Sequence, residues 1–292
     1  MKNIAHTPKK LFKSLLQQLG LYAYVLRIKR KKYQSIKMFA VTINGVKVQF
    51  STENEYSNSW FFPRYAGGKI HEKIVTDMLI KVLDGAKCFV DIGANLGWYT
   101  CLACKHMTQG IVYGFEMDDL NFAFLQKNIA INSCTNVEVH NLAISDSSGV
   151  LSYKRESNRP SPLFRLTSGD TDKNSAGLVS VGSITLDDFF KSKELMPDVI
   201  KIDVEGAEMN VLRGMRRITR EFKPTLFLEV HPDNLPSFNT SSSAILSLLI
   251  DSGYKVFEIE EMRGHESSER LKALSQGSVL ERNTMLYAVA AK

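Results

Sequence analysis

The chain repeats one hydrophobic pattern, in which a short apolar run is followed by an amphipathic segment. Strand-like runs occupy residues 88–93, 111–116, 136–144, 198–204 and 225–230, and helical patterns separate them at about 96–107, 119–132, 185–192 and 207–218. Nearly continuous apolar strands joined by helices are typical of a parallel sheet with helices on both faces. The pattern therefore predicts an α/β fold with a doubly wound, mostly parallel sheet.

The segments on either side of this repeat follow other patterns. Alternating apolar and polar residues around Asn44-Gly45 predict a β-hairpin with a type I′ turn, and a helix is expected at about 70–83. Near the C-terminus, a helix at 241–252 precedes two strands, at 254–260 and 283–290, with a polar loop between them. These two strands should form an antiparallel pair at the sheet edge.

One long polar stretch interrupts the repeat. Residues 154–183 are rich in Ser, Asn, Arg and Gly, and include Arg155, Arg159 and Arg165. This composition predicts an insertion or loop over the sheet, which could close over a substrate.

The charge distribution separates an N-terminal arm from the rest of the chain. The first 40 residues contain ten Lys or Arg and no Asp or Glu, so the net charge of +6 leaves about −4 for the remainder. Residues 9–28 place Leu at helical spacing with lysines opposite, which predicts a basic amphipathic helix. Residues 1–37 could bind an anionic membrane surface peripherally, or could pack on the body or remain a solvated tail. RNA is a further possible partner of the arm, although nucleic acid is not expected as the partner of this protein.

The cysteine content and the hydropathy bear on where in the cell the protein is located. Cys88, Cys101, Cys104 and Cys134 are too few and too clustered for a disulfide framework, and buried structural roles are expected for Cys101 and Cys104. No uncharged stretch reaches the roughly 20 residues of a membrane span. A reducing, cytoplasmic location is expected.

Two glycines stand at the place where such folds bind ligands. The first strand of the set runs through FVDIGANLGWYT, where Gly93 and Gly97 lead into a helix. Ligands of open α/β sheets bind beyond the carboxyl ends of the strands, and glycines let the main chain approach them closely. The spacing is neither GxGxxG nor a GK[ST] loop, which disfavours a dinucleotide and hence a nicotinamide oxidoreductase. Glu116, at the end of the second strand, is placed to accept hydrogen bonds from ribose hydroxyls.

A series of motifs resembles the FkbM family of S-adenosylmethionine-dependent methyltransferases. The motifs are DIGANLGWYT, GFEMD, NLAISDSSG, ITLDDF, IKIDVEGAE and LFLEVHP, in this order over roughly residues 86–231. The resemblance implies the class I methyltransferase fold, a Rossmann-like sheet of seven strands in the order 3-2-1-4-5-7-6 with the last strand antiparallel. It divides the chain into the arm, 1–37, and a methyltransferase domain, 38–292. That domain would comprise the hairpin 38–50, the cofactor-binding core 86–231 and the edge strands 254–290.

The resemblance also implies roles for individual residues. Those expected around S-adenosylmethionine are Asp91, Gly93, Ala94, Asn95, Gly97, Tyr99, Glu116, Met117, Ala143 and Ile144. Among them, Glu116 would hold the ribose, Met117, Ala143 and Ile144 would flank the adenine, and Asn95 and Tyr99 would lie near the methionine end.

Acidic residues cluster after the fourth and fifth strands of the set. KIDVEGAE brings Asp203, Glu205 and Glu208 within six residues, and LEVHP adds Glu229 and His231. Such a cluster needs a cation or protons to offset its repulsion, and a sulfonium is one such cation. Asp203, His231 and Glu205 are the candidate catalytic residues, with Asp203 or His231 as the base that removes an acceptor proton. Alternatively, Asp203 and Glu229 could hold a divalent ion such as Mg²⁺. Lys201 is expected at the sheet surface.

The motif after the fourth strand bears on the chemical class of the methyl acceptor. Methylases of exocyclic base amines typically carry [DNS]PP[YF] after this strand, whereas here the sequence is DVEGAE. The sequence therefore favours methyl transfer to a hydroxyl, and the resemblance indicates a sugar of a glycan or a natural product. A non-catalytic, membrane-associated binding protein that retains the fold is the alternative.

Overall fold

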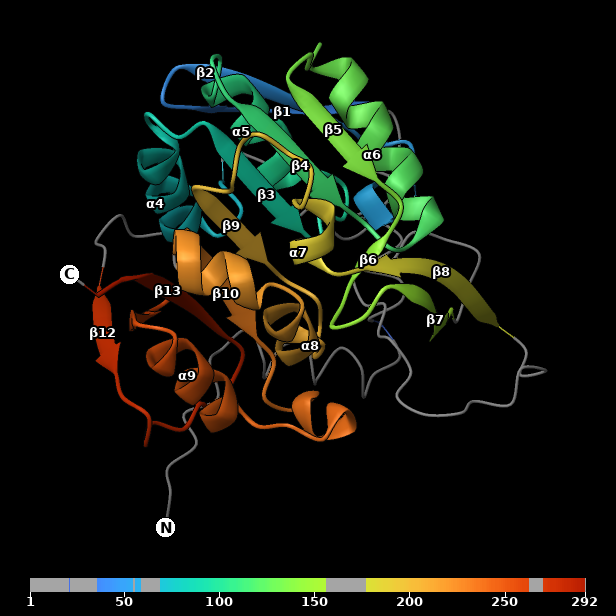
Figure 1. The fold of residues 1–292 in the computed structure, drawn as a ribbon. Helices are drawn as coiled ribbons and strands as arrows, with labels where there is room; N and C mark the ends of the chain where they lie inside the picture. The colour runs from blue at the N-terminus through green and yellow to red at the C-terminus, as the bar shows by residue number, and fades with distance from the viewer. Residues whose placement is uncertain are drawn as a thin grey trace.

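The computed structural model describes residue 21 and residues 36–54, 56–58, 69–155, 177–262 and 270–291, and they form an α/β fold around one large sheet (Figure 1). The predicted helix in 9–28, Arg159 and Arg165 lie outside these residues. Most of the sheet consists of β3 (Cys88–Ile92), β4 (Ile111–Phe115), β5 (Val137–His140), β9 (Val199–Ile202), β10 (Thr225–Val230), β11 (Tyr254–Ile259) and β13 (Thr284–Ala290). Their spatial order is β5-β4-β3-β9-β10-β13-β11. This is the order 3-2-1-4-5-7-6, so the expected fold is confirmed.

The edge of the sheet differs from the prediction in one respect. β13 pairs antiparallel with β10 and with β11, as expected, but β12 (Leu271–Leu274) adds an eighth strand beyond β11. β12 lies in the segment that was predicted to be a polar loop. Its residues are largely exposed, so the apolar pattern that would have predicted a strand is absent.

A second, three-stranded sheet occupies the region that was predicted to be an insertion. β6 (Ala143–Ile144) pairs parallel with β8 (Leu178–Ile184), which pairs antiparallel with β7 (Gly149–Lys154). The prediction of a loop over 154–183 is therefore wrong for its last part, which is strand. The polar composition was misleading because β8 alternates buried and half-exposed residues instead of being buried on both faces.

Helices and the N-terminal hairpin cover the two faces of the large sheet. One face packs against the hairpin of β1 (Met38–Ile43) and β2 (Val46–Ser51) and against α4 (Lys73–Leu83), α5 (Trp98–His106) and α6 (Asp119–Ile131). The other face packs against α7 (Leu186–Phe189), α8 (Glu208–Arg213) and α9 (Ser242–Asp251). The π-helical turn η2 (Ile218–Phe222) follows α8, and the 3₁₀ turn η3 (Leu235–Phe238) follows β10. In α7 only four residues are helical, fewer than the predicted 185–192.

The local sequence explains where several of these elements begin and turn. Asn44 and Gly45 adopt φ of 49° and 78°, which the type I′ turn requires, so the predicted hairpin is confirmed. The Asp118 side chain accepts a hydrogen bond of 2.9 Å from Asn121 N and thereby caps α6. Ser241 caps α9 in the same way.

Along the central strands, alternate side chains point to opposite faces, and this places two charged residues inside. In β3, Phe89 contributes to the core beside α5, whereas Val90 and Ile92 contribute to the core beside α8. Asp91 therefore points toward α5, and the strand register pairs it with Lys201 of β9. Both residues are buried, at 0% and 3% exposure.

One cysteine pair was not predicted. Cys104 on α5 forms a disulfide with Cys134, which follows α6, with their Cα atoms 5.9 Å apart. Cys88 and Cys101 are buried free thiols. The expected buried positions of Cys101 and Cys104 are confirmed, but a disulfide at Cys104 was not expected.

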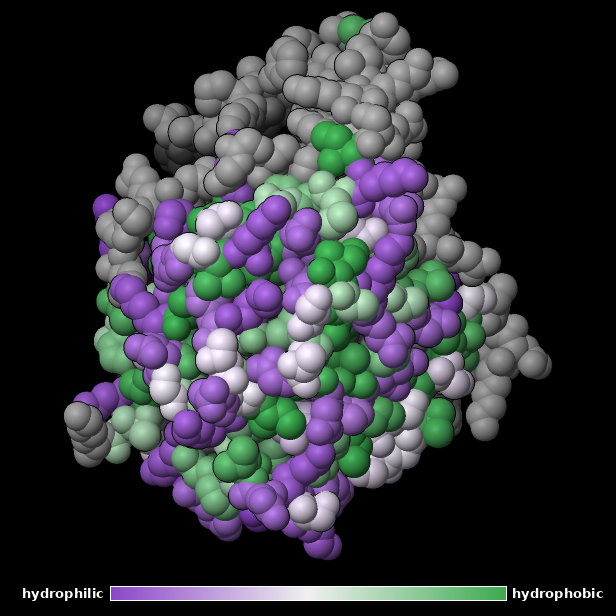
Figure 2. Space-filling view, turned by 90° about the horizontal axis from the view of Figure 1, so that it is seen from above, coloured by the Kyte–Doolittle hydropathy of each residue, from purple (hydrophilic) through white to green (hydrophobic). Residues whose placement is uncertain are grey.

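The described surface carries a few exposed large apolar side chains. Hydrophilic and hydrophobic residues are interspersed over the described part of the face in Figure 2. Among the described residues, no helix has both the length and the apolar character that a membrane crossing requires.

Candidate functional site

A pocket lies at the carboxyl ends of β3, β4 and β9. Its lining residues are Ile92, Gly93, Asn95, Phe115, Glu116, Met117, Asn121, Leu142, Ala143, Ile144, Asp203, Val204, Glu205 and Ala207. This is the edge of the sheet at which open α/β folds bind their ligands.

The glycine loop follows β3 and passes between the ends of β4 and β9, the two strands that flank β3 in the sheet. Gly93 N and Ala94 N each donate a hydrogen bond of 2.9 Å to Phe115 O at the end of β4. Gly93 has φ of +80°, and a Cβ on it would lie 1.9 Å from Asp203 O, beyond the end of β9. Any side chain at this position would therefore overlap the main chain that carries Asp203.

Glu116 is held at the pocket wall by the glycine loop and by the start of α6. Its Oε2 accepts a hydrogen bond of 2.7 Å from Asn95 N, and its Oε1 accepts one of 2.9 Å from Asp118 N. Burial raises the pKa of Glu116 to about 7, although the hydrogen bonds from Asp118 and Asn95 oppose this shift. A carboxylate has about four acceptor positions, so capacity remains for a ligand hydroxyl.

Beside Glu116 the pocket wall is apolar. Met117, Leu142, Ala143 and Ile144 form this part of the lining, together with Phe115. Met117 also packs against the small core beneath the three-stranded sheet, which includes Ala143 and Tyr153. An apolar wall next to a carboxylate suits a flat aromatic ring attached to a polyhydroxyl group.

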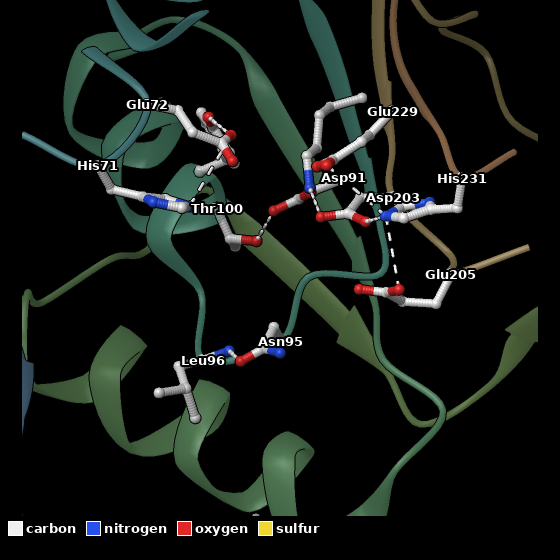
Figure 3. Close-up of polar contacts among 12 residues, drawn as sticks. His71, Glu72, Asp91, Asn95, Leu96, Thr100, Asp203, Glu205, Glu229 and His231 are labelled. Atoms are coloured by element: carbon white, nitrogen blue, oxygen red, sulfur yellow. Dashed lines mark hydrogen bonds and ion pairs between the residues drawn. The ribbon is translucent and has the colours of Figure 1, made fainter. Parts of the chain in front are cut away.

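The acidic end of the pocket is organised around Asp203 (Figure 3). Asp203 Oδ2 lies 3.2 Å from Lys201 Nζ, and its Oδ1 lies 3.8 Å from His231 Nε2. Burial would raise the pKa of Asp203, but the charges of Lys201 and His231 outweigh it and lower the pKa. Asp203 is therefore ionised at neutral pH.

His231 lies behind this end of the pocket and is 2% exposed. Its Nδ1 lies 2.7 Å from Oε1 of Glu208, which begins α8, and its Nε2 lies 3.5 Å from Glu205 Oε2 and 3.6 Å from Glu229 Oε1. Burial alone would lower the pKa of His231. The hydrogen bond with Glu208 and the charges of Asp203, Glu205 and Glu229 reverse the shift and raise the pKa to about 9.

Several residues predicted for the cofactor, for catalysis or for a metal do not line the pocket. The residues not in the lining are Asp91, Ala94, Gly97, Tyr99, Glu229 and His231. Asp91 Oδ2 accepts a hydrogen bond of 2.6 Å from Thr100, and Tyr99 donates one of 2.8 Å to Glu72. Burial raises the pKa of Asp91. Asp91 and Tyr99 therefore support the loop and Lys201 from below.

One expectation about a basic residue is wrong. Lys201 is buried within the sheet instead of lying at its surface, and its Nζ lies 4.9 Å from the centre of the Tyr99 ring. The nearest carboxylate of Lys201 is that of Asp203, two positions along the chain, whereas Asp91 is brought beside it by the register between β3 and β9. Arg155, of the predicted loop, bonds to Asp118, at 2.7 Å, and to Asp119.

The sequence also left part of the pocket unidentified. The lining residues that were not predicted are Ile92, Phe115, Asn121, Leu142, Val204 and Ala207. Most are apolar and could not be told from core residues by type. For Lys201 a signal existed, since a lysine within the apolar run VIKI of a strand buried on both faces needs a buried counter-charge.

Comparisons with known proteins agree with the motifs. The Methyltransferase FkbM domain matches residues 91–256. A hexuronic acid methyltransferase, AglP of Haloferax volcanii, is 28% identical over 55% of this chain and 62% of its own length. Methyltransferase 1 of Beauveria bassiana is 28% identical over 50% of this chain and 66% of its own length. The matched region thus spans less than two thirds of either relative.

Solved structures are also similar in part. A methyltransferase FkbM from Methylobacillus flagellatus has a TM-score of 0.44 at 20% identity and covers 70% of this chain and 43% of its own. The family match extends over more than half of the chain and contains the glycine loop, Glu116 and the acidic cluster. The chain therefore belongs to the FkbM methyltransferase family.

Proposed function

We propose that this protein is an S-adenosylmethionine-dependent methyltransferase that acts on a hydroxyl group of a sugar or a natural product. The observation that carries the proposal is the division of the pocket, in which Glu116 and an apolar wall form one part and the carboxylates of Asp203 and Glu205 form another. Membership in the FkbM family supports the same reaction class.

The described residues fit the cofactor. Gly93 lets the glycine loop pack directly against the main chain of Asp203, and both residues line the pocket. Glu116 accepts hydrogen bonds from ribose hydroxyls, and Met117, Ala143 and Ile144 pack against the adenine. When bound, S-adenosylmethionine supplies a methyl group on a positively charged sulfur, and the carboxylates at the acidic end favour that charge.

The residues at the acidic end orient the acceptor and receive its proton. Asp203 and Glu205 line the pocket and can accept a hydrogen bond from an acceptor hydroxyl, whereas His231 lies behind them. Methyl transfer depends mainly on alignment of the acceptor oxygen and on removal of its proton. Lys201 and His231 hold Asp203 ionised and fixed in place, so that it serves as the proton acceptor.

A sugar acid is the acceptor class that deserves the first assay, because AglP is named as a hexuronic acid methyltransferase. Incubation of the purified protein with S-adenosylmethionine and a glycan that contains hexuronic acid should give S-adenosylhomocysteine and a glycan heavier by one methyl group. Asp203→Asn should reduce the rate at least about a hundredfold, in line with the loss of a positioned general base. A methyl group that is lost in mild alkali would be an ester and would contradict transfer to a hydroxyl.

The raised pKa of Glu116 predicts how cofactor affinity depends on pH. The ionised carboxylate is the better acceptor for ribose hydroxyls, and with a pKa of about 7 it is protonated in an increasing share of the free protein below that pH. Binding must then release a proton, so the affinity should fall by up to about tenfold per pH unit as the pH drops below 7. Calorimetric titrations between pH 5.5 and 8.5 would measure this.

The matched variant for this titration is Glu116→Gln. It retains the size of the side chain but has no proton to release, so its affinity should be weaker at pH 8 and nearly constant across the same pH range. An unchanged pH dependence in Glu116→Gln would assign the titration to another group.

A further inference from the structure

Three ligand atoms converge at the acidic end of the pocket. One atom each from Asp203, Glu205 and His231 lies within 4.8 Å of the other two. His231 Nε2 is 3.8 Å from Asp203 Oδ1 and 3.5 Å from Glu205 Oε2, which is longer than a hydrogen bond of normal strength. Atoms that bind one metal ion at about 2.1 Å lie roughly 3–3.5 Å apart, so this spacing is close to that of a ligand set.

The orientation of His231 is fixed from the side away from the pocket. Its Nδ1 pairs with Glu208 Oε1 at 2.7 Å, and the same oxygen accepts a hydrogen bond of 3.0 Å from Gly206 N. The ring is 2% exposed, and Nε2 lies 3.5–3.8 Å from carboxylate oxygens of Asp203, Glu205 and Glu229. Nε2 is directed at Asp203 and Glu205 (Figure 3). A metal-binding histidine usually binds the ion through one ring nitrogen, while a carboxylate forms a hydrogen bond with the other ring nitrogen.

Asp203 is fixed in a comparable way. Lys201 Nζ, which is buried, lies 3.2 Å from Asp203 Oδ2, so that Oδ1 is the oxygen nearer to His231. Glu205 is held through its main chain, because Asn234 Nδ2 donates a hydrogen bond of 3.1 Å to Glu205 O. The main chain of Glu205 is left-handed, with φ of 53°, as is common for residues that a functional site holds in place.

We propose that Asp203, Glu205 and His231 bind one divalent transition-metal ion beside the acceptor position. The inference rests on the proposed function, in which an acceptor hydroxyl is bound at this end of the pocket. Glu229 also faces His231 Nε2, at 3.6 Å, but it does not belong to the converging set. The ion would bind the oxygen of the acceptor hydroxyl, and the proton would still leave to a carboxylate of the site.

The donor set indicates which ion. One imidazole nitrogen with two carboxylates suits Mn²⁺, Fe²⁺ or Zn²⁺, whereas Mg²⁺ prefers oxygen ligands alone. Affinity for such a site should follow the order Zn²⁺, then Mn²⁺, then Mg²⁺. This differs from a magnesium site built on Asp203 and Glu229.

The test is a titration of the full-length, chelator-treated protein with Mn²⁺, with free Mn²⁺ measured by electron paramagnetic resonance. The wild type should bind one Mn²⁺ per chain, which Zn²⁺ displaces more readily than Mg²⁺. Loss of a partner behind a metal ligand commonly costs 10–100-fold in affinity, and loss of a ligand should cost at least as much, so Glu205→Gln should weaken binding at least about tenfold. Glu205 is partly exposed, and the variant should fold as the wild type does.

Two further variants make the result specific. Glu138→Gln, at a half-exposed carboxylate that pairs with Lys193, should leave Mn²⁺ binding unchanged. Glu229→Gln should change it less than threefold, and a loss equal to that of Glu205→Gln would overturn the assigned ligand set. Absence of saturable Mn²⁺ binding in the wild type, or full binding in Glu205→Gln, would overturn the site.

The experiments distinguish an incorrect metal site from an incorrect proposed function. A wild-type protein that binds no Mn²⁺ but methylates a hydroxyl in the presence of chelator would refute the metal site alone. A protein that binds Mn²⁺ but does not bind S-adenosylmethionine would refute the proposed function and, with it, the role of the ion.

Discussion

Gly93→Ala should abolish measurable binding of S-adenosylmethionine, with a loss of affinity beyond about a hundredfold, or nearly 3 kcal/mol. The new Cβ would lie 1.9 Å from Asp203 O, and the main chain of either the glycine loop or Asp203 must move to relieve the overlap. Either movement displaces a wall of the pocket. Calorimetric titration with the cofactor, together with a thermal melt to verify folding, measures the effect.

Gly45→Ala is the matched control for this substitution. Gly45 has φ of +78°, nearly that of Gly93, but a Cβ there would meet nothing within 4 Å. The left-handed conformation alone costs an alanine roughly 1–2 kcal/mol, so Gly45→Ala should lower stability modestly and leave cofactor affinity unchanged. If Gly93→Ala bound the cofactor as Gly45→Ala does, the ligand would not lie against the glycine loop.

Lys201→Met should reduce the free energy of unfolding by roughly 3–5 kcal/mol, the usual cost of removing one partner of a buried ion pair. Lys201 is 3% exposed, and burial would lower its pKa, but the charges of Asp203, Asp91, Glu72 and Glu229 reverse this and raise it. Methionine fills a similar volume but leaves these carboxylates without their cation. Urea denaturation at pH 7 and pH 5 would measure the loss.

The pH dependence of this variant has a definite sign. Without Lys201 the pKa of Asp203 rises, since Lys201 is the strongest charge that lowers it. Asp203 can then take up a proton as the pH falls, so the difference from the wild type should shrink at pH 5. The control is Lys193→Met, because Lys193 is partly exposed beside Glu138 and should cost less than about 1 kcal/mol. Equal losses in the two variants would refute the role of Lys201 as the buried counter-charge.

The fold could be predicted to a large extent because each element carries its own hydrophobic period. The strands β3, β4, β9 and β10 follow mostly apolar runs of four to six residues, and the Asn44-Gly45 turn follows from the φ angles that these residues tolerate. The prediction of strands was wrong where the hydrophobic period of the sequence is weak. β8 alternates at its surface and β12 is largely exposed, so neither contains the continuous apolar run that identified the other strands.

The candidate site was only partly predictable. Gly93, Glu116 and Asp203 could be placed at one edge because parallel strands end together there. The role of Asp91 as a residue beneath the pocket depends on the register that pairs it with Lys201. That register joins residues more than a hundred positions apart, and no local pattern encodes it.

The sequence by itself determined the order and type of the main elements, the close approach of the main chain at Gly93, and the position of carboxylates at the strand ends. Only the tertiary structure decided which distant charges became partners: Lys201 with Asp91, and His231 with Glu208. The physical reason is that hydrophobic periodicity and backbone conformation are local properties of the chain. The state of a buried charge, in contrast, depends on the groups that folding brings within a few ångströms of it.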